Sequence, residues 1–238
     1  MVEILDYTTK TPLQMIGALS GVCYGVKDST PEKDKKRAIN CIMSGHGRTE
    51  EFPDIYMIIS DHSIKVMREF YTHIGGMPTR LQESTRYVDY SKQESDVHVP
   101  GKIMGNDEAK EKFFDAVQSC YTTYCRLIEL GVPPEDASYI LPLGIDTKVV
   151  VKMNLRTLVE MSHQRMCSRA HWEFQKIMGE IKWALLLYSD EWKEIATNLL
   201  EPKCEYLGFC PEKNSCGRKE QRKDKTWTHF DPEKGFHE

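Results

Sequence analysis

The sequence predicts an α+β protein, with mixed helices around a small, mostly antiparallel sheet. Apolar residues recur at helical spacing over several long segments, whereas only short runs of β-branched residues indicate strands. Strands and helices do not alternate strictly, which argues against a doubly wound parallel sheet. The chain has 238 residues, 40% of them hydrophobic, which is enough for one sizeable core.

The N-terminal half is expected to contain short strands and two helices before a longer signature region. Thr30, Pro31 and Glu32 are typical of a helix start, because a capping hydroxyl precedes a proline and an acid in the first turn. Gly45 ends that helix. The expected elements are strands over 2–5 and 55–59 and helices over 13–24 and 31–44.

The signature region runs from 63 to 91 and joins a buried helix to a polar loop. Its apolar residues have helical spacing, and Ser60 and Asp61 are plausible caps. Gly75 and Gly76 are expected to stop the helix, because glycine takes positive φ freely. The sequence thus predicts a helix that ends at a glycine pair and a loop after it.

The C-terminal half is expected to be mostly helical. Asn106 should cap a long helix that Gly131 closes, and a short helix should follow Pro133. The run Val149, Val150 and Val151 is typical of a strand. The remaining expected elements are this strand over 146–153, a helix that Asn154 caps, and a helix over 170–188.

The last part of the chain changes in composition, so we divide the chain into a domain over 1–200 and a polar tail over 201–238. Cys204, Cys210 and Cys216 are separated by five residues each, and His229 and His237 follow. This pattern fits either a small zinc or iron site or a loosely ordered tail with free thiols or a disulfide. Because the gaps do not match common zinc knuckles, the sequence assigns no metal.

Composition excludes several classes of function. The net charge is −4, with no basic excess that would suit general nucleic-acid binding. No apolar run approaches the length of a membrane span, and the N-terminus lacks a signal-peptide pattern. We therefore expect a cytoplasmic protein without nucleic-acid or membrane partners. The other cysteines are expected to be reduced, small hydrophobic residues.

The polar loop offers chemistry that suits an anion. Arg80 and Arg86 can form paired bonds to phosphate or carboxylate, and Gln82 and Ser84 can add directional hydrogen bonds. A solvated loop with surface arginines explains the same residues. No Walker loop, Gly-x-Ser-x-Gly or Gly-x-Gly-x-x-Gly motif is present, so a cofactor would bind without a Rossmann fold.

Two ordered stretches resemble one family. REFYTHIGGMPTRLQESTRYVDYS and ILPLGIDTKVVVKMNLRTLVEMSHQRMCSRAHWEFQ resemble the signature regions of flavin-dependent thymidylate synthases, over roughly residues 1–190. The resemblance implies that family's fold and the reductive methylation of dUMP to dTMP. It also implies FAD as cofactor, NADPH and methylenetetrahydrofolate as co-substrates, hydride delivery from reduced flavin, and a homotetramer with flavin at subunit junctions.

The resemblance also implies roles for residues at matching positions. Arg165 matches the arginine that contacts the pyrimidine, and we expect it to act in catalysis. The implied substrate-binding residues are Glu69, Arg80, Gln82, Ser84, Arg86, Lys148 and Arg165. The implied cofactor-binding residues are His73, Asn154, Arg156 and Glu160.

The chain departs from the family pattern at several of these positions. Thr72-His73-Ile74 stands where the family has Arg-His-Arg, and Glu160 replaces an asparagine. We hypothesise that Arg80 replaces one of the lost arginines. Two alternatives stay open: a nucleotide-binding relative that serves as a sensor or assembly partner, and an enzyme that methylates a different pyrimidine nucleotide.

Overall fold

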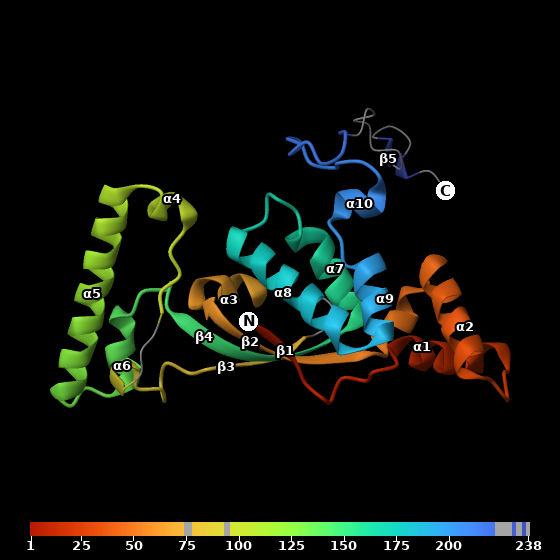
Figure 1. Ribbon diagram of the computed structural model, residues 1–238, viewed down its shortest axis with the longest axis horizontal. Helices are drawn as coiled ribbons and strands as arrows, with labels where there is room; N and C mark the ends of the chain where they lie inside the picture. Colours follow the sequence, from red (N-terminus) through yellow and green to blue (C-terminus); the bar gives the residue numbers. More distant parts are fainter. Residues whose placement is uncertain (74–77, 93–95, 222–229, 232–234, 237–238) are drawn as a thin grey trace.

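The centre of the fold is a four-stranded sheet in the order β1-β2-β4-β3, with every neighbouring pair antiparallel (Figure 1). The computed structural model describes residues 1–73, 78–92, 96–221, 230–231 and 235–236. The α+β prediction is confirmed. The strands of the sheet are β1 (Val2–Ile4), β2 (Asp54–Ser63), β3 (Thr79–Gln82) and β4 (Asp146–Asn154).

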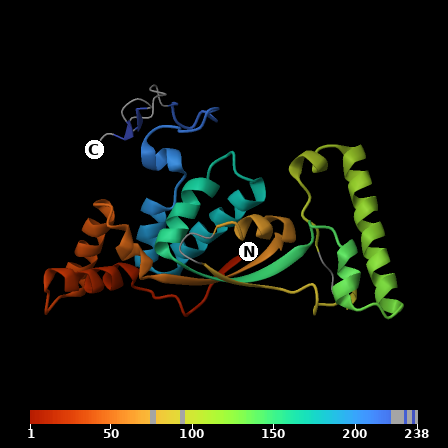
Figure 2. The ribbon, with the colours of Figure 1, turned by 180° about the vertical axis from the view of Figure 1, so that it is seen from behind.

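Helices cover one face of the sheet and extend beyond both of its ends. Helices α3, α7, α8 and α9 lie over one face, α1 and α2 stand at one end, and α4, α5 and α6 project from the other (Figures 1 and 2). Their bounds are α1 (Pro12–Gly21), α2 (Pro31–Met43), α3 (Ile64–Phe70), α4 (Gly101–Met104), α5 (Asp107–Glu129), α6 (Pro134–Ala137), α7 (Leu155–Arg165), α8 (Trp172–Tyr188), α9 (Asp190–Leu199) and α10 (Lys203–Leu207).

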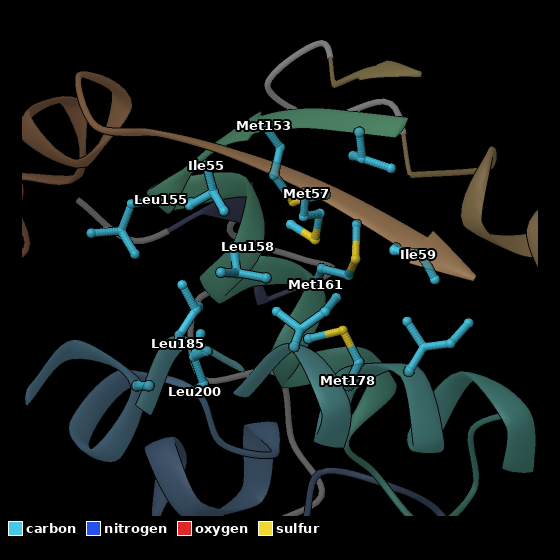
Figure 3. Packing of buried hydrophobic residues seen from close by; sticks show 14 of the residues in the cluster. Ile55, Met57, Ile59, Met153, Leu155, Leu158, Met161, Met178, Leu185 and Leu200 are labelled. Carbon is cyan, nitrogen blue, oxygen red and sulfur yellow. The ribbon is translucent and has the colours of Figure 1, made fainter. Parts of the chain in front are cut away.

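The main core lies between the sheet and these covering helices. Alternate residues of β2 and β4 point into it, because side chains alternate between the two faces of a strand. Figure 3 shows Met57 of β2 and Met153 of β4 facing Leu158 of α7 and Met178 of α8, and all four side chains are fully buried. Each such side chain contributes about 1.5–3 kcal/mol of burial free energy.

The opposite face of the sheet is less covered. Ile58 on β2 is partly buried, Val150 on β4 is exposed, and Leu81 on β3 is 72% exposed. No helix lies over this face among the residues drawn in colour in Figures 1 and 2. Ile58, Val150 and Leu81 pair across neighbouring strands, so they form one short apolar row on this face, and Lys148 and Lys152 lie on either side of it.

Three details of the signature region differ from the prediction. Ser63, and not Ser60 or Asp61, caps α3, since its hydroxyl accepts from the Val66 amide at 3.1 Å. The helix ends at Phe70, before the glycine pair, which lies outside the described residues. The segment 79–82, expected as loop, is strand β3, because its backbone pairs with β4.

An irregularity in β2 shapes the neighbouring buried side chains. The pairing register of β2 with β4 shifts between Ile59 and His62, and Asp61 takes a φ of +59°. A bulge of this kind redirects the residues that follow it. His62 and Ser63 are consecutive, yet both are buried on the helix-covered side.

The predicted helix caps at Thr30, Asn106 and Asn154 are confirmed. Each side chain accepts a hydrogen bond from the backbone amide three residues further on, which satisfies a donor that the helix leaves free. In the described part of the chain, no helix is both long and apolar enough to cross a membrane.

The tail begins close to α7. The ring of Tyr206 in α10 stacks on His163 of α7 with centroids 4.9 Å apart, and the carbonyl of Glu201 accepts from Ser162 at 3.4 Å. Strands β5 (Phe230–Asp231) and β6 (Gly235–Phe236) pair with each other and form a second, two-stranded antiparallel sheet. The division at residue 200 remains a prediction, and His229 and His237 lie outside the described residues.

Candidate functional site

The C-terminal ends of α3 and α7 bring Arg165 and His73 into direct contact. Arg165 Nε donates a hydrogen bond to His73 Nε2 at 2.7 Å, although 92 residues separate the two in sequence. The Arg165 guanidinium also lies over the Phe174 ring of α8, 4.8 Å from its centroid. The ring of His73 meets Phe174 edge-on at 5.5 Å. Phe174 thus holds both polar side chains in one orientation.

His73 is uncharged in this position. Burial, together with the positive charges of Arg165 and Arg80, lowers the pKa of His73 from 6.5 to about 4. Since Nε2 accepts from Arg165, a neutral ring carries its proton on Nδ1. The site therefore combines a permanent positive charge with a neutral imidazole at neutral pH.

Glu69 and His171 complete this group, which we call the Arg165 cluster: Glu69, His73, Arg165, His171 and Phe174. The carboxylate of Glu69 is 3.8 Å from Arg165 Nη1 and 3.9 Å from His171 Nδ1. Neither distance is a hydrogen bond. His171 Nδ1 is buried and, within the described part of the chain, has no hydrogen-bond partner. Such an atom is costly to leave unsatisfied, which suggests that a ligand group belongs beside it.

Arg80 lies near the cluster but is already bound to the backbone. Its Nη1 donates to the Phe70 carbonyl at 2.8 Å and to the His73 carbonyl at 3.3 Å, and its guanidinium covers the Tyr71 ring at 4.5 Å. Arg80 therefore caps the end of α3, where helical carbonyls lack partners. Its positive charge still acts on His73, as the hypothesis of a replacement arginine requires.

A second group lies where β3 leaves the sheet. Gln82 donates to the Thr147 hydroxyl at 3.2 Å, and the amide after it, from Glu83, bonds the Lys148 carbonyl at 2.8 Å. Two further site residues follow in the next turn: Ser84 Oγ accepts from the amide of Arg86 at 3.3 Å. These contacts place Gln82, Ser84 and Lys148 near one another.

Arg86 points away from the protein interior and pairs with Glu135 of α6. Its guanidinium bonds both carboxylate oxygens, at 2.9 and 3.1 Å, and both side chains are more than half exposed. An exposed pair of this kind adds little stability. The same paired geometry suits a phosphate, so Arg86 can exchange one anion for another.

The third group lies at the N-terminal end of α7. Asn154 caps the helix, and Arg156 is held by Glu51 at 2.7 Å and by Glu160 at 3.1 Å. Arg156 and Arg165 are nine residues apart, or about 13 Å along the helix axis. Within one chain, the predicted site residues thus form three groups instead of a single pocket.

A buried network beneath the Arg165 cluster was not predicted. The carboxylate of Glu173 accepts from the amide and the hydroxyl of Ser63, both at 2.6 Å, and lies 3.6 Å from His62 Nδ1. Burial alone would raise the pKa of Glu173, but His62 and Ser63 hold it down at about 2. His98 stacks on His62 and hydrogen bonds to Asp146.

His171 and Phe174 were also missed. Both belong to the second family-like stretch, and His171 directly precedes α8, so a histidine at a helix start six residues after Arg165 was the available signal. Neither residue type identifies itself in sequence, because histidine and phenylalanine also occur in ordinary cores.

The fold and the site together define a class: an α+β protein with an arginine–histidine cluster where helices end beside a small antiparallel sheet. A comparison with protein families specifies this class further. The family described as thymidylate synthase complementing protein matches residues 3–185, and the chain belongs to that family.

Curated relatives agree over most of the chain. It is similar to a flavin-dependent thymidylate synthase of Nitratidesulfovibrio vulgaris, with 31% identity over 91% of this chain and 94% of the relative. Enzymes of the same name from Pyrococcus furiosus and Geobacter sulfurreducens are 28% and 27% identical, over 93% and 88% of this chain and 95% and 91% of their own lengths.

Proposed function

We propose that the chain is a flavin-dependent thymidylate synthase that converts dUMP to dTMP with methylenetetrahydrofolate, NADPH and FAD. Family membership and the names of the relatives support this proposal. The single observation that carries it is the contact of Arg165 with a neutral His73.

Arg165 is proposed to bind the uracil ring and to stabilise negative charge that develops on it. Phe174 and His73 fix the guanidinium, and Glu69 forms an ion pair with it at 3.8 Å without a hydrogen bond. A positive charge held in place where charge develops lowers the barrier without reorganisation. In this arrangement the neutral His73 orients Arg165 without neutralising its charge.

The nucleotide phosphate is proposed to lie at the second group. Ser84 and Arg86 would contact it, with Gln82 and Lys148 beside them. Lys148 contributes charge but not the paired geometry of an arginine. Phosphate binding here requires that Arg86 release Glu135, which is inexpensive for an exposed pair.

The residues around His73 fit a flavin. His171 offers a buried ring nitrogen without a partner among the described residues, and the neutral His73 ring carries a hydrogen-bond donor at Nδ1. His73, Asn154 and Arg156 would hold the cofactor. When bound, FAD supplies the hydride that completes the new methyl group.

We also propose a homotetramer in the cytoplasm. Arg156 is surrounded by Glu50, Glu51 and Glu160, so this end of α7 alone offers no net positive charge to a pyrophosphate. A second subunit packed on the open face of the sheet, at the apolar row of Ile58, Val150 and Leu81, would supply the missing groups. Leu81 and Val150 make that face a suitable contact surface.

The test is a turnover assay with dUMP, methylenetetrahydrofolate, NADPH and FAD, in which dTMP is measured by chromatography. Wild-type protein should form dTMP, and Arg165→Gln should lose at least about 100-fold, as expected when a charge-stabilising donor is removed. Arg126→Gln on α5 is the matched control, because Arg126 is exposed and pairs only locally with Glu129. Equal activity of the two variants would contradict the assigned role of Arg165.

A second candidate is a nucleotide-binding relative without catalysis. The carboxylates that hold Arg156 favour it, since they occupy a position that the resemblance assigns to the flavin. This candidate predicts dUMP binding in calorimetry with no flavin uptake and no dTMP. A third possibility, methylation of another pyrimidine nucleotide, predicts that this nucleotide displaces dUMP from the protein.

A further inference from the structure

Four cysteines line one cavity beside the C-terminal end of α7. The cavity has a volume of about 360 Å³, and Cys167, Cys204, Cys210 and Cys216 all belong to its wall. Cys167 and Cys204 are 37 residues apart in sequence, so it is the folded structure that brings Cys167 together with the three cysteines of the tail. The sequence indicated three of them and assigned no metal. All four are free thiols in the structure.

Helix ends and a backbone hydrogen bond of the tail position these cysteines around the cavity. Cys167 follows α7, Cys204 lies in α10, and the Cys210 amide bonds the Glu220 carbonyl at 2.7 Å. Cys204 and Cys210 are only 8% and 7% exposed. Two nearly buried thiols thus face a cavity instead of packing into the core.

The loop that carries Cys216 is tied back to the body of the protein. Arg169 donates to the Asn214 carbonyl at 3.0 Å, and Arg218 donates to the Met166 carbonyl at 3.3 Å. Ser215 Oγ accepts from the Gly217 amide at 3.1 Å, and Gly217 has a φ of +90°, which favours glycine. These bonds bring Cys216 to the same cavity as Cys167.

The charge of the cavity wall suits an anionic group. The wall includes four Lys or Arg side chains and one carboxylate: Arg169, Lys203, Arg218, Lys219 and Glu212. Four thiolates around a metal–sulfide core carry net negative charge, and nearby cations stabilise it. Arg169 pairs with Glu212 at 3.7 Å and Lys219 with Glu205 at 2.8 Å, so the positive excess of the wall comes from Lys203 and Arg218.

The spacing of the four cysteine side chains distinguishes a mononuclear zinc site from an iron–sulfur cluster. Among the described residues, no three ligating side chains stand close enough together to hold a single metal ion. A mononuclear zinc site requires such closeness, with thiolates about 2.3 Å from one ion. An iron–sulfur core holds its thiolates further apart than a single zinc ion does, so a cavity of about 360 Å³ lined by four cysteines suits such a core.

We propose that Cys167, Cys204, Cys210 and Cys216 bind an iron–sulfur cluster. The cavity wall shares no residue with the Arg165 cluster, and the proposal does not depend on the proposed function. Its ligands are thiolates from the end of α7 and from the tail, and its wall of Lys and Arg side chains balances the charge of the cluster.

The test is iron and acid-labile sulfide analysis of the full chain purified without oxygen. We expect equal amounts of iron and sulfide, about two to four of each per chain. Bound flavin does not affect either measurement. If the protein is isolated without metal, reconstitution with ferrous iron and sulfide under reducing conditions should give the same content. Reduction with dithionite should then produce a paramagnetic signal distinct from that of a flavin radical.

Cysteine variants locate the cluster. Cys216→Ser should lose most iron and sulfide with little effect on folding, because Cys216 is exposed and has little packing to lose. Cys23→Ser is the matched control, since Cys23 is also exposed but lies outside the cavity wall. Circular dichroism checks that both variants fold.

Four results would overturn the proposal. One is stoichiometric zinc without sulfide, and another is a disulfide among these cysteines in protein kept free of oxygen. The third is iron and sulfide content that Cys216→Ser and Cys23→Ser lower equally. A folded chain that takes up neither iron nor sulfide on reconstitution also excludes the cluster.

Discussion

His73 is expected to stay uncharged well below neutral pH, and Arg165→Gln is expected to reverse part of this effect. The pKa of His73 falls from 6.5 to about 4, and this depression of about 2.5 units corresponds to about 3.4 kcal/mol in favour of the neutral form. Burial is the largest cause and Arg165 the second. Arg165 therefore contributes no more than half, so its removal should raise the pKa by up to about 1.2 units.

The same shift links stability to pH. The folded-state pKa of His73 is depressed, so between pH 6.5 and about 4 the unfolded chain binds a proton that the folded chain does not. The contribution to stability is present above pH 6.5 and is lost as pH falls to about 4. Arg165→Gln should lose less stability over this interval than wild type.

The assay is an NMR titration of protein labelled at its histidine rings, in which His73→Gln identifies the resonance. Arg156→Gln is the matched control, since Arg156 lies at the other end of α7 and forms its own ion pairs. It should leave the His73 titration unchanged. A wild-type pKa near 6.5, or no change in Arg165→Gln, would refute the reasoning.

Two further predictions concern stability, measured by urea unfolding. Glu173→Gln should lower the free energy of unfolding by about 2–3 kcal/mol at pH 7, because the charged acceptor of two Ser63 hydrogen bonds is lost. It should also flatten the acid-side decline of stability between pH 4.5 and about 2, and an unchanged decline would contradict the depressed pKa. Gly17→Ala should destabilise by several kcal/mol, since its Cβ would meet the Asp34 carbonyl oxygen at 1.8 Å. Gly179→Ala, where a Cβ meets nothing within 4 Å, should instead stabilise by up to about 1 kcal/mol, and similar effects of the two would contradict the packing of α1 on α2.

Local signals predicted most of the fold. The caps at Thr30, Asn106 and Asn154 and the valine run in β4 reflect interactions within a few residues, so they are visible in sequence. Strand β3 was missed because its residues are polar and half exposed. Only its pairing with β4 makes it a strand, and that pairing joins residues about 70 positions apart.

The same distinction between local signals and long-range contacts holds for the candidate site. Arg165 and His73 were selected by resemblance to a family, but nothing in sequence indicated that their side chains touch. The pairings of Arg86 with Glu135 and of Arg156 with Glu51 likewise join distant parts of the chain. Within one chain, these two predicted site arginines therefore form ion pairs with carboxylates.

The fold class, the main helices and the family resemblance could be predicted from local sequence, because propensity, capping and motif order are properties of neighbouring residues. Which of these residues share an environment depends on the packing of distant segments. That packing placed His171, whose Nδ1 has no hydrogen-bond partner among the described residues, in the Arg165 cluster, and it added Cys167 to the three cysteines of the tail. Both depend on contacts between segments far apart in the chain, and long-range packing of this kind leaves no periodic signal in sequence.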